Sequence, residues 1–304
     1  TSRCTLSFTS PALSNGCLAL RVSSPNAAGA LSSPVSSTVI IATVAPLSST
    51  LVIANDNGSP PVTVANGGST NDTTPLLSGV VSAAEAGDVV RIYDNISGTQ
   101  ALVGTAIVQA NGSWSFSSTL AAGTHPLSVT VTDAAGNISG TTTASVTIDT
   151  TAPTVQLTNT VNNNGSTPVA IANNGSTNDN TPALSGTAEA GSVVVVRDGQ
   201  TVVGSVVAAA NGTWSITTST LGEGAQTLTV TATDAAGNVG TATNTITFTV
   251  STAATAAPTL VVNNDANSTL TPVANNGATN DNPPTLTGTA TVGNVITVYD
   301  GSTV

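Results

Sequence analysis

Three short sequence blocks recur along this chain in the same order and at similar spacing. They are Asn-Asp-Thr-Thr-Pro at 71–75 (with changes, again at 178–182 and 280–284), Asn-Gly-Ser-Trp at 111–114 (with Thr for Ser, again at 211–214) and Asp-Ala-Ala-Gly-Asn at 133–137 (again at 234–238). Self-similarity at a fixed period is the signature of repeat architectures. The sequence therefore predicts an array of similar units.

An Ala-Pro pair marks the start of each unit. The pairs end at Pro46, Pro153 and Pro258, which gives a period of about 105 residues. Residues 46–152 and 153–257 are therefore interpreted as two complete repeats.

The flanking segments match parts of the same repeat. Leu-Ser-Phe at 6–8 occupies the place of Trp-Ser-Phe at 114–116, so residues 1–45 are interpreted as a diverged second half. Residues 258–304 carry the Asn-Asp block and are interpreted as a first half. The first half of one molecule could complete the second half of another by strand complementation. The alternative is that the sequence is a window on a longer chain.

Within a repeat, apolar residues alternate with threonine. In 226–233 and 244–250, Leu, Val, Ile and Phe fall on one face and Thr on the other, which is the pattern of a half-buried strand. Turn signals such as Asp-Gly and Asn-Gly separate these runs. The strands predicted in the second repeat are 154–160, 183–188, 192–197, 201–208, 213–218, 226–233 and 244–250, with a short extra hairpin around 168–172. Seven short strands in about 105 residues are typical of an immunoglobulin-like sandwich.

Composition restricts the partners. The chain has 15 acidic residues against four basic ones, all arginine, and a net charge of −11. This balance argues against a nucleic-acid partner, because phosphate binding needs clustered Lys and Arg. No apolar run reaches the roughly 18 residues of a membrane helix, so no membrane span is expected. A surface without lysine suits a protein exposed to trypsin-like proteases, although compositional drift within a repeat explains it equally well.

With these blocks and turns, the chain resembles the bacterial Ig-like repeats of giant secreted adhesins and biofilm-associated surface proteins. The resemblance covers essentially the whole chain. It implies an all-β fold of tandem seven-stranded immunoglobulin-like β-sandwiches arranged as an extended rod. It also implies an extracellular, cell-surface location and, in many members, stiffening by calcium.

The sequence contains no pattern typical of an enzyme. No Ser/His/Asp arrangement recurs between repeats, and no Cys/His cluster with metal-ligand spacing is present. His125 is the only histidine and has no counterpart in the second repeat, so it is expected at the surface. Trp114 and Trp214 occur once per repeat at a strand start and are expected in the core.

A calcium site is predicted where the linker enters the second repeat. In a seven-stranded sandwich successive loops alternate between the two ends, so the linker and three turns, at Glu189, Asn211 and 234–238, should gather at one end. This would bring together Asp149, Glu189 and Asp234, with Asn238 or backbone carbonyls completing an oxygen shell of the kind that calcium prefers. The alternative is that these are ordinary turn residues held by local hydrogen bonds.

The two cysteines, Cys4 and Cys17, fall near the N-terminal end on what the pattern predicts as neighbouring strands. A disulfide would require an oxidising compartment. Two free buried thiols are the alternative.

The leading functional hypothesis is a structural or adhesive extracellular repeat region that acts as a stiff spacer or fibre in cell-surface adhesion or a biofilm matrix. Its partners would be neighbouring repeats, copies of itself, or a host, abiotic or matrix surface. Two alternatives stay open. The repeats could form a glycan- or surface-binding module, or they could be spacers attached to a secreted enzyme.

Overall fold

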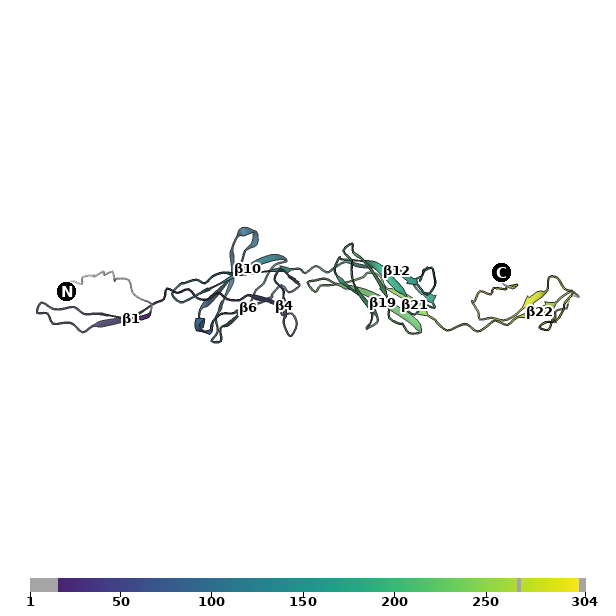
Figure 1. The fold of residues 1–304 in the computed structure, drawn as a ribbon, viewed down its shortest axis with the longest axis horizontal. Coiled ribbons are helices and arrows are strands. Elements are labelled where there is room, and N and C mark those ends of the chain that lie inside the picture. Colours follow the sequence, from purple (N-terminus) through teal and green to yellow (C-terminus); the bar gives the residue numbers. More distant parts are fainter. Residues whose placement is uncertain (1–15, 267–268, 301–304) are drawn as a thin grey trace. The chain divides into compact units, whose positions relative to one another are not determined.

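The computed structural model describes residues 16–266 and 269–300. Strands dominate this part of the chain (Figure 1), and its only helical segments are two short 3-10 turns, η1 (Ala83–Glu85) and η2 (Ile96–Gly98). The all-β fold expected from the alternating pattern is confirmed. None of the helical segments described is long and apolar enough to cross a membrane.

The first complete repeat consists of two sheets, one of four strands in the order β4-β3-β6-β9 and one of five in the order β5-β11-β10-β7-β8. The neighbours are antiparallel, except for β5, which runs parallel to β11. The strands are β3 (Val52–Asn55), β4 (Val62–Val64), β5 (Ser69–Thr70), β6 (Leu76–Val80), β7 (Val89–Asp94), β8 (Ala101–Ile107), β9 (Ser113–Ser117), β10 (Gly123–Thr132) and β11 (Thr142–Ile148).

Alternation along the strands forms the core of this repeat. On β10, Leu127, Val129 and Val131 are buried, and they belong to one cluster with Leu77 and Trp114 from the other sheet. Successive side chains of a strand point to opposite faces, so the residues between them face outward. Trp114 is 2% exposed, which confirms its expected place in the core.

The second complete repeat has the same arrangement. Its sheets follow the orders β13-β12-β15-β18 and β14-β21-β19-β16-β17, with β20 paired to β19. The strands are β12 (Val155–Asn162), β13 (Val169–Ala170), β14 (Gly175–Thr177), β15 (Ala183–Ala188), β16 (Val193–Asp198), β17 (Thr201–Val207), β18 (Thr213–Thr217), β19 (Gly224–Thr233), β20 (Val239–Thr241) and β21 (Ile246–Val250). Trp214 is 4% exposed, as expected.

All seven strands predicted for this repeat are present, but seven is too low a count. β13 lies in the hairpin predicted around 168–172 and pairs with β12. β14 and β20 were not predicted. β14 is a three-residue strand that pairs with the distant β21, and such strands have no local periodicity to reveal them.

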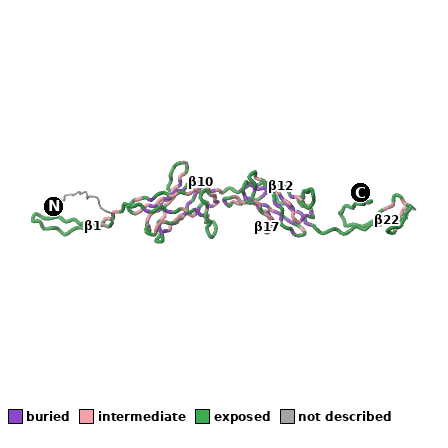
Figure 2. Tube along the Cα trace, viewed as in Figure 1, coloured by how far each residue is buried: buried purple, intermediate pink, exposed green. Residues whose placement is uncertain are grey.

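The flanking segments form small sheets of their own. β1 (Gly16–Val22) pairs with β2 (Val35–Ile41), and β22 (Val261–Asn264) pairs with β23 (Thr271–Pro272) and β24 (Thr285–Thr287). Most of the side chains in these flanking sheets are exposed, whereas each complete repeat has a buried interior (Figure 2). Leu286 is 44% exposed, while Leu77, its counterpart in the first repeat, is fully buried.

Candidate functional site

The Asp-Ala-Ala-Gly-Asn turn joins β10 to the last part of the first repeat. Asp133 Oδ1 accepts hydrogen bonds from the backbone N–H of Ala135 (2.9 Å) and of Asn137 (2.8 Å), and Oδ2 accepts one from Asn137 Nδ2 (2.7 Å). The Asn137 side chain and these backbone N–H groups lower the pKa of Asp133 below its ordinary value, against the opposing effect of desolvation. The turn is therefore closed by its own first and last residues.

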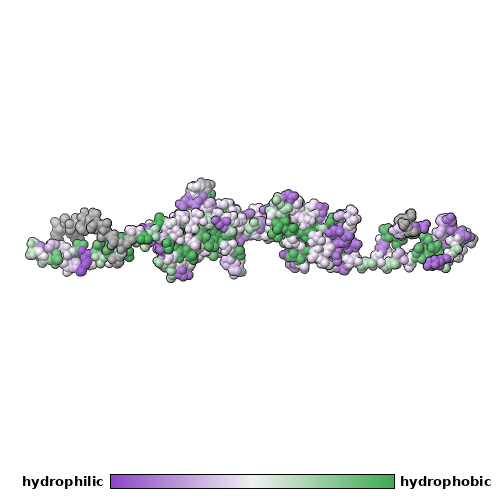
Figure 3. Space-filling view, in the orientation of Figure 1, coloured by the Kyte–Doolittle hydropathy of each residue, from purple (hydrophilic) through white to green (hydrophobic). Residues whose placement is uncertain are grey.

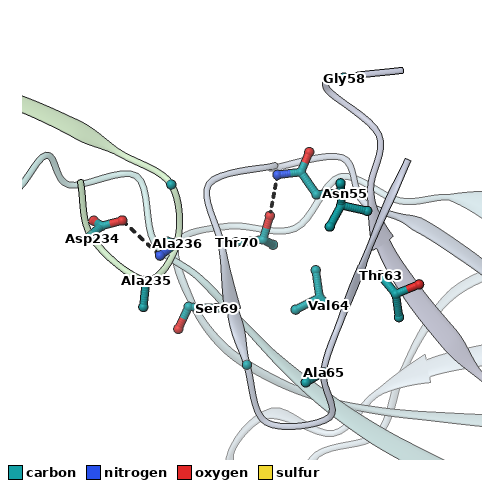
Figure 4. Close-up of a pocket in the computed structure, with 13 residues that line it drawn as sticks. Asn55, Gly58, Thr63, Val64, Ala65, Ser69, Thr70, Asp234, Ala235 and Ala236 are labelled. Carbon is teal, nitrogen blue, oxygen red and sulfur yellow. Dashed lines mark hydrogen bonds between the residues drawn. The ribbon is translucent and has the colours of Figure 1, made fainter. Parts of the chain in front are cut away.

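The second repeat has the same turn with nearly the same geometry. Asp234 Oδ1 accepts from the N–H of Ala236 (2.9 Å) and of Asn238 (2.9 Å), and Oδ2 accepts from Asn238 Nδ2 (2.8 Å). Figure 4 shows the bond between Asp234 and Ala236. Both residues that the sequence assigned to the calcium site here are thus already engaged within the turn.

The asparagine at the end of each turn also holds the linker that enters its repeat. Asn137 Nδ2 donates to the main-chain oxygen of Ala42 (3.1 Å), and Asn238 Nδ2 donates to that of Asp149 (2.9 Å). In both repeats the accepting residue lies four positions before the boundary proline. Sequence reasoning missed this contact, because the acceptor is a main-chain group and any residue can supply it.

The other two predicted calcium ligands have main-chain and local contacts. Asp149 donates its N–H to Thr70 O (2.9 Å) and accepts the N–H of Thr151 on Oδ1 (2.9 Å). Glu189 donates its N–H to Thr154 O (3.1 Å). Across residues 16–266 and 269–300, no three His, Cys, Asp or Glu side chains form a group that could hold a metal ion. The calcium site stays a prediction.

The Asn-Asp block contains a buried carboxylate. Asp72 is fully buried and accepts from the N–H of Asp56 (3.0 Å), the N–H of Thr74 (2.8 Å) and Thr74 Oγ1 (3.2 Å). Asp179 has the same place in the second repeat, where Asn163 and Thr181 are its donors. The aspartate therefore connects the loop after the first strand of each repeat, β3 or β12, to the residues just before β6 or β15.

A matching asparagine supports this connection. Asn55 Nδ2 donates to Thr70 Oγ1 (3.0 Å), as Figure 4 shows, and Asn162 Nδ2 donates to Thr177 Oγ1 (3.1 Å). The sequence marked the block only as a recurring feature of the repeat. The threonine two residues after each aspartate was the available clue, because Asp and Thr at that spacing form local hydrogen bonds.

The Asp56 and Asp72 carboxyls lie close together and shift each other's pKa. Burial would raise the pKa of Asp72, but the hydrogen bonds from Asp56 and Thr74 outweigh it and lower the pKa. Desolvation, followed by the hydrogen bond and charge of Asp72, raises the pKa of Asp56. The second repeat has no such pair of neighbouring carboxyls, because Asn163 occupies the position equivalent to Asp56.

The prediction for His125 was wrong, because this residue is 3% exposed. Its Nδ1 lies 2.6 Å from Asp94 Oδ2 and its Nε2 lies 2.8 Å from Ala121 O. The second repeat has Gln226 at this place, which donates to Gly222 O (2.9 Å) and Gly224 O (3.2 Å). The two side chains share one task, which is to hold the loop before the long central strand. The inward positions 127, 129 and 131 share the parity of 125, and this was the signal that could have placed His125 inside.

The predicted disulfide cannot be placed, because Cys4 lies outside the described residues. The pairing of Cys4 with Cys17 stays a prediction.

Two sandwiches with the same buried tryptophan, the same buried aspartate and the same linker-holding turn define a tandem immunoglobulin-like repeat protein. The chain belongs to the bacterial Ig-like domain family, whose model matches residues 43–150 and 153–252. No curated protein sequence matches the chain.

Three solved structures illustrate what the chain is similar to. The fibronectin(III)-like modules of CbhA from Clostridium thermocellum are 17% identical (TM-score 0.38), with 66% of this chain and 93% of theirs covered. The BSP domain of a biofilm-associated protein is 23% identical (TM-score 0.23), with 61% and 29% covered. A tetra-tandem repeat from the extending region of a large adhesion protein is 22% identical (TM-score 0.27), with 83% and 60% covered.

Proposed function

We propose that the chain is a stiff spacer or fibre segment of an extracellular adhesion or biofilm-matrix protein, located at the cell surface. The observation that carries this proposal is the hydrogen bond from each turn asparagine to its linker, found in both complete repeats. A linker fixed to the repeat that follows it has fewer backbone conformations than a free linker, and this favours stiffness. Repeats that each contact mainly their neighbours form quasi-one-dimensional arrays.

The composition supports the extracellular part of the proposal. The chain lacks lysine and has only four arginines, so it gives trypsin-like proteases few cleavage sites. Calcium at Asp149, Glu189, Asp234 and Asn238 is a further element of the proposal and would add stiffness to the same linker.

Small-angle X-ray scattering of the chain tests the spacer role. The double variant Asn137→Ala, Asn238→Ala removes both linker hydrogen bonds and should broaden the distribution of distances. The matched control is Asn111→Ala, Asn211→Ala, which removes turn hydrogen bonds to Ser113 and Thr213 that have no link to a linker. Equal scattering from wild type, test and control variants would contradict the proposed source of stiffness.

A further inference from the structure

Strands β8 and β17 are the outer strands of the larger sheet in their repeats. Among the described residues, β8 pairs only with β7, and β17 pairs only with β16. Each is seven residues long, whereas the strands at the opposite edges of the same sheets, β5 and β14, have two and three residues. The free edge of a strand carries unpaired N–H and C=O groups that can pair with another strand.

Neither edge strand carries a charged residue or a proline, although Gln109 Nε2 donates to the main-chain oxygen of Ile107 at the end of β8 (3.0 Å). Natural sheets block edge pairing with lysine, proline, inward-pointing charges or bulges. The sequences Ala-Leu-Val-Gly-Thr-Ala-Ile of β8 and Thr-Val-Val-Gly-Ser-Val-Val of β17 contain no charged residue and no proline. A register shift does occur in each pair, at Ile92/Tyr93 and at Val196/Arg197, but it leaves Gly104–Ile107 and 204–207 in a regular ladder.

Apolar side chains are exposed along both edges. Leu102 and Ile107 on β8 are 54% and 51% exposed, and Val202 and Val207 on β17 are 48% and 59% exposed. Val207 lies opposite Val193, which is itself 42% exposed. These five residues are called the edge stripes. The space-filling view shows hydrophobic residues at the surface of both complete repeats (Figure 3).

On the far side of the same sheet face the outward positions are polar. On the interior strands the outward positions are Thr143, Ser145 and Thr147 on β11, and Thr247 and Thr249 on β21. The apolar exposure therefore belongs to the edge strand and the strand beside it, where Val89 and Val195 are half-buried, and it recurs in both repeats although the two sequences of the edge strand differ.

We propose that these edges pair with the same edges of a second copy of the chain. Backbone groups at a free edge select a strand as the partner, and two identical strands can pair antiparallel about a two-fold axis. The chain has a net charge of −11, so most of its surfaces repel a second copy. β8 and β17 are uncharged, and their pairing brings two apolar stripes together without placing like charges opposite each other. This lateral association goes beyond the spacer role and does not depend on it.

Sedimentation of the whole chain over a range of concentrations tests this proposal. Wild type should associate reversibly, and more strongly at high salt, because salt screens the repulsion between copies. The variant Thr105→Lys, Ser205→Lys places a charge on each edge and should weaken association by about tenfold or more. Both lysines make the chain less negative, so general repulsion between copies cannot account for the loss.

The matched control is Thr143→Lys, Thr249→Lys, which makes the same charge change on the same sheet face but on interior strands. It should associate as wild type does. Circular dichroism verifies that each variant is folded, and concentration-dependent protection of amide hydrogens should be confined to β8 and β17. A wild type that is monomeric at high salt and high concentration, an equal loss in both lysine variants, or protection located elsewhere would each overturn the proposal.

Discussion

Asn238 Nδ2 donates to two oxygens that belong to different segments of the chain. One is the carboxylate Oδ2 of Asp234 at 2.8 Å, and the other is the main-chain oxygen of Asp149 at 2.9 Å. One amide group therefore closes the turn and holds the linker at the same time. Asn137 does the same in the first repeat, with Asp133 and Ala42. Both contacts need a side-chain N–H donor at the last position of the turn. Aspartate could not replace asparagine there, because a carboxylate cannot donate.

The first prediction concerns this amide. Asn238→Ala removes both side-chain hydrogen bonds and should lower the free energy of unfolding by about 1–3 kcal/mol. Asn211→Ala removes bonds to Thr213 within an exposed turn only, and should cost about 1 kcal/mol or less. Denaturant unfolding followed by circular dichroism measures both. An equal loss in the two variants would mean that the linker contact adds nothing to stability.

The second prediction concerns the buried pair of His125 and Asp94. His125→Ala leaves the Asp94 carboxylate buried without its partner, which should cost about 3 kcal/mol. His125→Gln introduces the residue found in the second repeat and should restore a large part of this loss, because glutamine can also donate to the loop. Urea denaturation of the three proteins gives the comparison. The idea that the two residues share one role would fail if glutamine were no better than alanine.

The third prediction is a pH dependence from the coupled carboxyls. The lowered pKa of Asp72 stabilises the fold above its ordinary value of 3.8, and this contribution is lost as the pH falls through the folded-state pKa. The raised pKa of Asp56 acts in the opposite direction, because its contribution is present at low pH and is lost as the pH rises through the folded-state pKa.

The melting temperature of the Asp56→Asn variant should therefore rise relative to that of wild type as the pH increases from about 3.8 towards neutrality. Asn163 already occupies the equivalent place, so Asn163→Asp should produce the reverse trend in the second repeat. Calorimetric melts across this pH range measure both. A difference from wild type that is the same at every pH would rule out coupling between the two carboxyls.

The fourth prediction separates the two core tryptophans. Trp114 Nε1 donates to Ser49 Oγ at 2.6 Å, whereas Trp214 Nε1 is buried and has no partner in the described part of the chain. A buried N–H without a partner lowers the stability of the fold. Trp214→Phe removes this N–H, which offsets part of the stability lost with the ring contacts. Trp114→Phe should therefore destabilise the chain by about 1 kcal/mol more than Trp214→Phe. Equilibrium unfolding in guanidinium, followed by circular dichroism, measures both losses. A larger loss in Trp214→Phe than in Trp114→Phe would contradict this interpretation.

The sequence predicted the elements that carry a local signal. The strand at 183–188 was placed with its observed ends, because alternation and flanking turns define it. β14 was missed because it pairs with β21, which is far away in the sequence, and β20 was missed because three residues are too few to show an alternating pattern. At the candidate site, Asp234 and Asn238 do lie together as expected from the turn. The contact of Asp149 is made through its main-chain oxygen, and residue type carries no information about such a contact.

The last prediction is calcium at the linker into the second repeat. If calcium binds Asp149, Glu189, Asp234 and Asn238, then millimolar calcium should raise the melting temperature of the chain relative to chelator. Asp149→Ala should abolish that increase, because it removes one carboxylate ligand. The control is Asp198→Ala, which removes a carboxylate from the end of β16 and should leave the calcium response unchanged.

The hydrogen-bonded turn makes a different prediction for the same experiment. Asn238 donates to the main-chain oxygen of Asp149, and alanine keeps that oxygen. Under this alternative, Asp149→Ala loses only the bond from the N–H of Thr151 and melts nearly as wild type does, with or without calcium. Asn238→Ala, by contrast, lowers the melting temperature in both conditions. A calcium-dependent rise that disappears in Asp149→Ala therefore supports the metal site, and curves that do not respond to calcium remove it and leave the amide as the group that holds the linker.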